Sequence, residues 1–260
     1  MLTLIAESKT MLPSEKPVSV KDFAEHTPVY DDIAGAIMDS LGGLSLEDLA
    51  AETKLSSSLA AKMQRYIYEF DNKSTGNPAI EAYTGVVFKA LDFSSLSEDA
   101  KLRCCRETAI ISSLYGWLRP YDIVKTYRLD FTSRLEEEPV NGLTMNAFWR
   151  KDVTKALVRK IQEDNITEIL HILPSDAAAC IDWKLVKRFA KVWKVDFREM
   201  KDEGKFKTPI ASKLKTMRGK LLRQILEEGI ENVKDLMKIE SVDYFCEGTP
   251  VYSDHISFLC

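Results

Sequence analysis

The sequence lacks any long hydrophobic run. No uninterrupted apolar stretch approaches the roughly 20 residues that a membrane-spanning helix needs. The apolar start, residues 1–6, meets Glu7 and Lys9 at once, so it is too short for the core of a signal peptide. We therefore expect these residues to form a first buried strand, in a protein with no membrane partner.

Cysteine, glycine and proline are also scarce. The 5 cysteines (at 104, 105, 180, 246 and 260) form no CxxC pair. An odd count without a secretion signal is typical of reduced thiols, which predicts a cytoplasmic location. Only 11 Gly and 9 Pro in 260 residues exclude a collagen-like or low-complexity chain.

The familiar chemical motifs are missing as well. The sequence holds no GxxxxGK[ST], GxGxxG, HExxH or GxSxG pattern. His26, His171 and His255 lie far apart, and none has ligand spacing with a cysteine. We therefore expect no metal and no cofactor, and these patterns assign no catalytic residue.

The hydrophobic content and its spacing predict one folded domain. Of the 260 residues, 45% are hydrophobic, and apolar residues recur with both helical and strand spacing along the chain. We predict a single domain over residues 1–260, of mixed α/β (α+β) class, with a mixed β-sheet and surrounding helices. Helices are expected at 31–41, 46–53, 57–70, 78–91 with a break near Gly85, 97–114, 146–163, 184–190 and 210–228. Strands are expected at 1–6, 169–173, 192–197, 242–246 and 256–259.

Charge is distributed unevenly. The formal net charge of −4 alone argues against a nucleic-acid-binding protein. However, residues 1–100 hold 16 acidic and 8 basic residues (−8), whereas residues 184–223 hold 14 basic and 4 acidic residues (+10). Such asymmetry indicates polyanion binding; lysines that solvate helix faces are the alternative.

Residues 45–70 resemble a helix-hairpin-helix element. Ser45 and Asp48 have the spacing of a helix cap, Leu55 can anchor a tight turn, and Ala60 lies where close helix packing needs a small residue. In such a hairpin the N–H groups at the start of the second helix favour a phosphate. The turn lacks the glycines of the usual pattern, so a plain helical hairpin is the alternative.

Several segments in register carry a wider resemblance. The chain resembles the YaaA family of bacterial peroxide-stress proteins over nearly its whole length. The matching segments are SKT at 8–10, LS at 55–56 with LA at 59–60, YTGVVF at 83–88, SLYGWLRPYD at 113–122, YRLD at 127–130, RL at 134–135, FW at 148–149, GKFK at 204–207, the Ala211/Lys215/Arg218-Gly219 spacing, and Gly229.

The resemblance implies a cytoplasmic protein with one mixed α/β domain and a helix-hairpin-helix element beside a positively charged cleft, and no enzymatic activity comes with the family name. It implies DNA binding and protection against hydrogen peroxide, partly by limiting free iron and the DNA damage that iron drives. Two segments depart from the family pattern: Glu7-Ser8 precede Lys9, and residues 174–178 read PSDAA. A pocket built from those segments would be altered here.

The first hypothesis is therefore a DNA-binding stress protein that contacts duplex or distorted duplex DNA without sequence specificity. We expect a monomer. Tyr115 and Tyr127 would stack on unpaired bases, although Tyr115 and Trp117 also suit a packing role, and Arg119 suits an ion pair with Asp122 or Asp130. The candidate DNA-binding residues are Lys9, Lys54, Ser56, Ser57, Ser58, Lys62, Tyr115, Arg119, Tyr127, Arg128, Arg134, Lys205, Lys207, Lys213, Lys215 and Arg218.

Two other hypotheses remain open. One is a DNA- or nucleobase-processing enzyme of glycosylase or lyase type. Its amine nucleophile would be Lys9, Lys213 or Lys215, with Asp122 or Asp130 as the acid–base partner. The other is an iron-sequestering protein, which the lack of clustered ligand residues disfavours.

Overall fold

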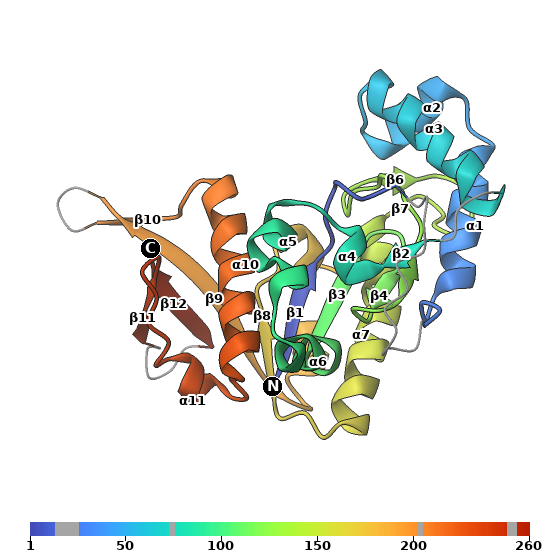
Figure 1. Cartoon of the computed structure of the whole chain (residues 1–260). Coiled ribbons are helices and arrows are strands. Elements are labelled where there is room, and N and C mark those ends of the chain that lie inside the picture. The colour runs from blue at the N-terminus through green and yellow to red at the C-terminus, as the bar shows by residue number, and fades with distance from the viewer. Residues whose placement is uncertain (14–25, 73–75, 202–204, 249–253) are drawn as a thin grey trace.

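The computed structural model describes residues 1–13, 26–72, 76–201, 205–248 and 254–260. Its centre is a sheet of 8 strands in the order β11-β12-β9-β8-β1-β3-β4, with β10 paired to β9 (Figure 1). Strands β12, β9, β8, β1 and β3 run parallel, and β4 and β11 are antiparallel edges. The strands are β1 (Leu2–Ala6), β3 (Thr108–Ser112), β4 (Gly116–Leu118), β8 (Glu168–His171), β9 (Lys191–Met200), β10 (Phe206–Lys207), β11 (Phe245–Gly248) and β12 (His255–Leu259). The predicted mixed α/β class is confirmed.

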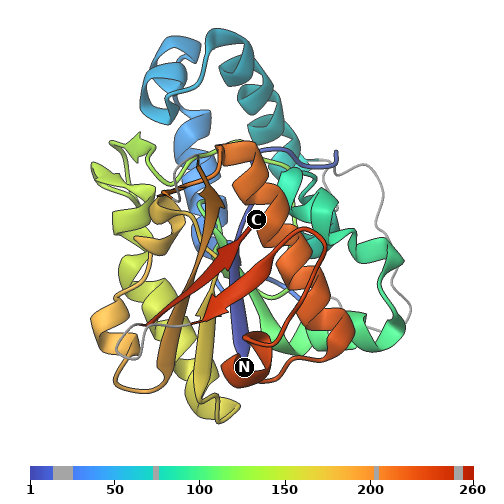
Figure 2. The same ribbon diagram turned by 90° about the vertical axis from the view of Figure 1, so that its left-hand side faces the viewer.

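Helices cover both faces of the sheet. α5 (Val86–Leu91), α6 (Glu98–Glu107) and α10 (Ala211–Glu228) pack together on one face, and α7 (Met145–Glu163) lies on the other (Figure 2). α1 (Asp31–Gly42), α2 (Leu46–Thr53) and α3 (Ser57–Asn72) form a lobe above the carboxyl ends of the parallel strands (Figure 1). The short elements are α4 (Ala79–Ala82), a 3-10 turn (Phe93–Ser95), α8 (Ser175–Ala178), α9 (Trp183–Val186), α11 (Val233–Leu236), β2 (Asn77–Pro78) paired with β5 (Ile123–Val124), and β6 (Arg134–Leu135) paired with β7 (Leu143–Thr144).

Most of the predicted helices are confirmed, with one clear error. The helix expected over residues 97–114 ends at Glu107, and Thr108–Ser112 forms strand β3 instead. All residues of β3 are buried because helices cover both faces of the sheet at this point. A strand buried on both faces shows no alternation of apolar and polar residues, so its sequence can be mistaken for a buried helix. The loop expected around residues 115–120 likewise contains β4.

α2 and α3 form a tight hairpin over the predicted residues 45–70. The side chain of Ser45 caps α2 by accepting a hydrogen bond from the Asp48 N–H, as predicted. Lys54 adopts the left-handed conformation (φ 57°) that reverses the chain, and Leu55 and Ala60 are buried beside the turn. The packing of a helical hairpin is thus as the sequence indicates. A DNA-binding role for the hairpin remains a prediction.

Helices α5 and α10, which cover one face of the sheet, approach each other closely at Gly219. Gly219 in α10 lies against α5 so closely that an added Cβ atom would sit 2.2 Å from the carbonyl oxygen of Val87 and 2.7 Å from the Cβ atom of Ala90. No side chain fits there. Because α5 and α10 also border the pocket described below, Gly219 fixes the distance between two of its walls.

The connections of the sheet reverse direction between β1 and β8. The chain leaving β1 leads to β3 on one side of β1, whereas the chain leaving β8 leads to β9 on the other side. In open sheets of this kind the loops diverge at such a switch point and leave a crevice at the carboxyl ends of the strands, where ligands generally bind. The carboxyl edge of the sheet between β1 and β8 is therefore the expected place for a ligand site.

Candidate functional site

A cavity of about 300 Å³ occupies the switch point between β1 and β8. We call it the switch-point pocket. It is lined by the chain leaving β1 (Ala6 to Thr10), the start of α5 (Gly85 to Phe88), Asp130 and Phe131, the chain leaving β8 (Pro174 and Asp176), and Lys215 of α10. Apolar walls thus surround carboxylates, ammonium groups and hydroxyls, a composition typical of small-ligand sites.

Glu7 carries the most perturbed carboxyl group of the pocket. Oε2 accepts a hydrogen bond of 2.9 Å from the Ser113 N–H and another from the Tyr127 hydroxyl, and Oε1 accepts one of 2.6 Å from the Ser113 hydroxyl. Burial nevertheless raises the pKa of Glu7 to about 7, because desolvation outweighs these donors. A carboxyl group that titrates near neutral pH is suited to accept or donate a proton.

Behind Glu7 lies a buried chain of hydroxyl groups. The Tyr127 hydroxyl is 2.7 Å from the Tyr83 hydroxyl and 2.7 Å from the Ser112 hydroxyl. Burial, reinforced by the nearby Glu7 carboxylate, raises the pKa of both tyrosines well above the ordinary value, so both remain protonated donors. The network fixes the Glu7 carboxyl group at one end of the pocket.

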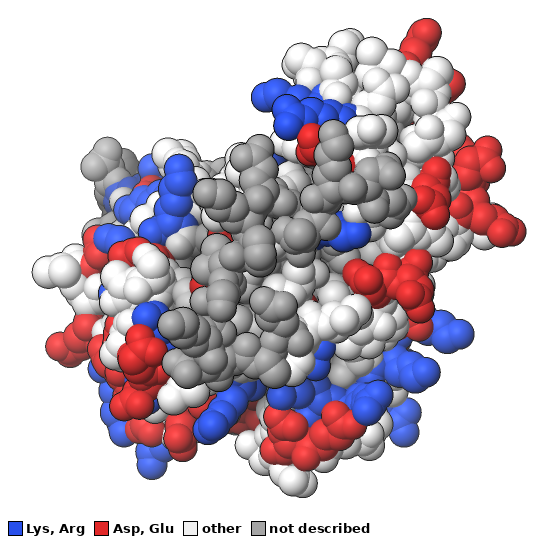
Figure 3. Space-filling view, turned by 45° about the vertical axis from the view of Figure 1, so that its right-hand side comes forward, with Lys and Arg blue, Asp and Glu red and all other residues white. Residues whose placement is uncertain are grey.

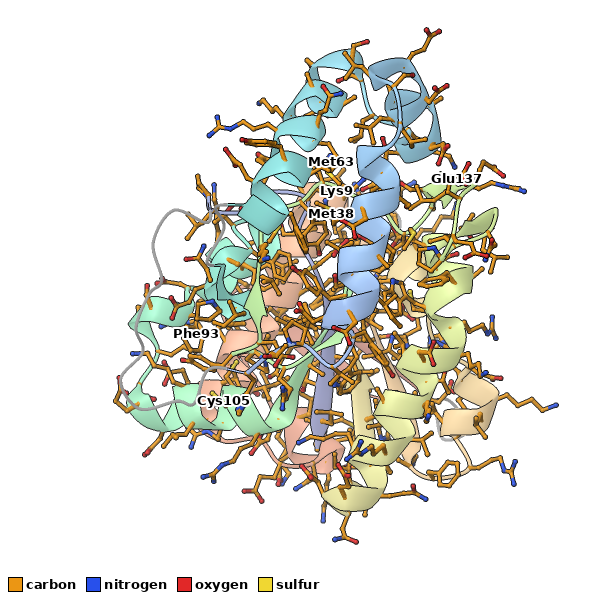
Figure 4. The ribbon with its side chains drawn as sticks, turned by 90° about the vertical axis from the view of Figure 1, so that its right-hand side faces the viewer. Lys9, Met38, Met63, Phe93, Cys105 and Glu137 are labelled. Carbon is orange, nitrogen blue, oxygen red and sulfur yellow. The ribbon has the colours of Figure 1, made fainter. Side chains whose placement is uncertain are left out.

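Lys9, two residues after Glu7, also lines the pocket. Its ammonium lies 2.7 Å from Oδ2 of Asp130, and its carbonyl oxygen accepts a hydrogen bond from the Arg128 guanidinium. Among the described residues, no group donates a hydrogen bond to the other oxygen of Asp130. The Arg128 N–H also donates to the sulfur of Met63 on α3, in the hairpin lobe (Lys9 and Met63 are labelled in Figure 4). The rim of the pocket and the hairpin are therefore neighbours.

A second cavity, of about 430 Å³, lies on the other side of α8. We call it the basic pocket; its charged and imidazole groups are His171, Lys194, Asp196, Arg198 and Arg218. Burial lowers the pKa of His171 to about 4, so this imidazole is neutral at physiological pH. Burial also lowers the pKa of Arg218, which forms no ion pair with any residue in the described ranges. Lys215 and Arg218 lie about one turn apart on α10, one in each pocket.

The structure places the predicted residues in three ways. Lys9 and Lys215 line the switch-point pocket, and Arg218 lines the basic pocket. Lys62, Ser57 and Ser58 are exposed on α3, and Lys205 is exposed near β10. Other predicted residues contact groups of the chain: Lys54 donates to the Thr132 carbonyl oxygen, Arg134 pairs with Glu136, and Lys207 and Lys213 pair with Glu199. The hydroxyl of Ser56 contacts that of Ser58.

Three of the predicted residues need correction. Tyr115 and Tyr127 are 0% and 4% exposed, so neither ring is available to stack on a base; the packing role expected as the alternative for Tyr115 is confirmed. Arg119 pairs at 2.7 Å with Asp122, a fully buried carboxylate, as its own alternative predicted. Asp122 is thereby committed to Arg119 and is not a free acid–base partner.

Comparison with known proteins fixes the family. The sequence profile described as "Peroxide stress protein YaaA" matches residues 1–248. The chain belongs to the YaaA family. It is 30% identical over 238 residues to a UPF0246 protein of Parabacteroides distasonis, covering 91% of this chain and 90% of that one. It is also 30% identical over 244 residues to a UPF0246 protein of Crocosphaera subtropica, covering 94% of each.

The sequence does not predict two residues of this YaaA-family pocket as site residues. It marks Glu7 and Asp176 only as departures from the family pattern, yet both line the pocket. Their position in the sequence is the signal that could have identified them, because each acid closely follows a buried parallel strand.

In the described part of the chain no helix is long and apolar enough to cross a membrane, and no three His, Cys, Asp or Glu residues group as metal ligands.

Proposed function

We propose that this YaaA-family chain contributes to peroxide defence in the cytoplasm by binding DNA along its phosphate backbone, which limits iron-driven damage to the bound DNA. The observation that supports this is the position of cations on both sides of the switch-point pocket. Lys62 is exposed on α3 of the hairpin lobe, and Lys201 is exposed just after β9. Lys215 and Arg218, in the first half of α10, line the switch-point pocket and the basic pocket. Phosphate contacts of this kind position a protein on DNA without reading sequence.

The charge on the hairpin lobe supports the same orientation. In Figure 3 the side of the lobe that faces the body carries Lys and Arg, and its far side carries Asp and Glu. A polyanion approaching the carboxyl edge of the sheet would therefore meet cations on the hairpin and repulsion beyond it. Lys9, Lys54, Arg119, Arg128 and Arg134 have partners within the chain, so they contribute less than the sequence indicates.

Charge reversal on the two sides of the pocket tests the proposal. For the variant Lys62→Glu/Lys201→Glu we expect DNA affinity to fall at least about tenfold at moderate salt. The slope of log affinity against log salt should fall by about 2, because two phosphate contacts are lost. Fluorescence anisotropy with labelled duplex, bubble and junction DNA measures both quantities.

The matched control reverses the same amount of charge at the other end of the sheet. Arg106 of α6 and Lys234 of α11 are exposed, and both helices lie toward the amino ends of the parallel strands (Figure 1). Arg106→Glu/Lys234→Glu should bind DNA nearly as the unchanged protein does. Equal losses in the two variants would mean that only net charge matters, and salt-independent or absent binding would reject the proposal.

A second candidate is an enzyme that processes a nucleobase. The pKa of Glu7 near 7, inside a pocket, favours it. A lysine nucleophile is less well supported, because Lys9 is ion-paired and because Glu199 raises the pKa of Lys213, the opposite of what an amine nucleophile needs. Base release from damaged duplex DNA, lost in Glu7→Gln, is the test; no release from any damaged substrate rejects this candidate.

A further inference from the structure

The switch-point pocket has a composition that selects its ligand. Three carboxyl groups line it, from Glu7, Asp130 and Asp176. Within the described residues each of them retains acceptor capacity. Glu7 accepts three hydrogen bonds, and Asp176 accepts one from the Ala177 N–H. Asp130 uses Oδ2 for Lys9, and its buried Oδ1 has no donor among the described residues. A carboxylate offers about four acceptor positions. The free acceptor positions therefore favour a ligand that carries hydrogen-bond donors.

The other walls require more than a simple cation. Val86, Val87, Phe88, Phe131 and Pro174 present apolar surface to the cavity, so part of the ligand is apolar. The Lys215 ammonium also lines the pocket and contacts no acceptor in the described part of the chain. It favours an anionic or acceptor group on the same ligand. A small amine satisfies the carboxylates but leaves the apolar walls and Lys215 without a counterpart.

A nucleotide with an amino-bearing base meets all these requirements. The base is flat and apolar on its faces and presents amino donors on its edge, and the phosphate is an anion. The volume of about 300 Å³ is at the small end of ligand pockets, which suits one nucleotide unit. Proteins that act on a base in DNA extrude it into a pocket that reads its edge by hydrogen bonds and packs its faces on apolar side chains.

The neighbouring basic pocket provides a further cation for the phosphate of such a nucleotide. Residues of the α8 turn separate the two cavities, with Pro174 and Asp176 facing one and Leu173 and Ser175 the other. Arg218 lies in the second cavity, about one helical turn from Lys215. A phosphate group beside the switch-point pocket would therefore find cations from the same helix. The base would then lie in the switch-point pocket, with the phosphate beside Lys215 and toward Arg218.

We propose that the switch-point pocket binds the base of a single nucleotide that carries an exocyclic amino group, with Glu7, Asp130 and Asp176 accepting from its edge and Lys215 and Arg218 facing its phosphate. The source of the nucleotide is either the free pool or a base extruded from bound DNA. The second source rests on the function proposed above.

Calorimetric titration with free deoxynucleoside monophosphates tests the site without DNA. We expect dAMP, dCMP or dGMP to bind at least tenfold more tightly than dTMP, whose base has no exocyclic amino group. Equal binding of all four, no binding of any, or tighter binding of spermidine than of every nucleotide would overturn the proposal.

Two variants locate the binding. Asp176→Asn preserves the shape of the side chain and its bond from Ala177 but removes the charge, and it should weaken the preferred nucleotide at least tenfold. Val86→Trp, at an exposed position on the rim (39% exposed), should block entry without disturbing the core. The control Asp39→Asn makes the same carboxylate-to-amide change on an exposed position of α1 and should leave affinity unchanged. Unchanged affinity in both pocket variants would place the nucleotide elsewhere.

A DNA arm separates the two sources. Duplexes with one unpaired cytosine and with one unpaired thymine are compared with a fully paired duplex in the unchanged protein and in Asp176→Asn. A preference for unpaired cytosine that Asp176→Asn abolishes identifies extruded DNA bases as ligands. Nucleotide binding without any DNA binding would reject the proposed function and leave the site as one for free nucleotides. DNA binding without any base preference, together with no nucleotide binding, would reject the site alone.

Discussion

Replacing Gly219 with alanine is expected to lower the free energy of unfolding by about 2 kcal/mol. The new methyl group would lie 2.2 Å from the Val87 carbonyl oxygen and 3.1 Å from the Leu91 nitrogen, both backbone atoms of α5. Backbone cannot turn aside as a flexible side chain can, so α5 and α10 must separate. This loss outweighs the gain of about 1 kcal/mol that alanine brings to a helix interior. Urea denaturation followed by circular dichroism measures the difference.

Gly35→Ala is the matched control for this prediction. Gly35 also lies inside a helix, α1, but an added Cβ atom there meets no atom within 4 Å. Only the helix propensity changes, so we expect stability to rise by up to about 1 kcal/mol. If both substitutions stabilise the protein, the close contact between α5 and α10 is absent in solution. If only Gly219→Ala destabilises it, nucleotide affinity should fall as well, because Val87 and Lys215 line the pocket.

Glu7→Gln is expected to change how stability depends on pH. In the unfolded chain a glutamate ionises near 4.5, whereas burial raises the pKa of Glu7 in the folded protein to about 7. The folded protein therefore retains a proton that the unfolded chain has already released. Protonated Glu7 therefore contributes to the free energy of unfolding. This contribution is fully present below pH 4.5 and is lost as pH rises through 7. It amounts to at most about 3 kcal/mol.

Glutamine is neutral at every pH, so the loss of stability that Glu7 ionisation causes should be absent in Glu7→Gln. Its amide oxygen can accept from the Ser113 N–H, and its NH₂ group can donate to the Ser113 hydroxyl oxygen. We expect Glu7→Gln to gain stability relative to the unchanged protein as pH rises from about 5 to 8, the range set by the Glu7 pKa. Other titrating groups, such as His171, are common to both proteins and cancel in the difference. A constant difference across this range would show that Glu7 ionises normally.

The sequence predicted the local structure well wherever one residue decides it. Ser45 caps α2, Gly85 separates α4 from α5, and Gly229 ends α10 in the left-handed conformation (φ 64°). These outcomes depend on a few neighbouring residues. The helix prediction for residues 108–112 is wrong because helices elsewhere in the chain bury β3 on both faces. The spacing of apolar residues within 108–112 does not show this burial and does not distinguish a strand from a helix.

The site was harder to predict for a related reason. Lys9 and Lys215 were identified as candidates because they are basic, but Glu7 was not, because its pKa depends on burial beside Ser113 and Tyr127. Adjacency of β1 and β8 creates the pocket, and pairing order in a sheet is a long-range property. The stacking role predicted for Tyr115 and Tyr127 failed because aromatic residues near cations look alike in sequence whether they are buried or exposed.

The order in which the pocket walls occur along the chain also has a consequence for biosynthesis. A growing polypeptide emerges from the ribosome with the hairpin lobe before β8, and the last wall of the cavity, Lys215 on α10, follows β8 and β9. A chain interrupted after α3 would therefore carry the hairpin but no enclosed cavity. Any activity of the cavity is in this way restricted to molecules whose translation has passed α10.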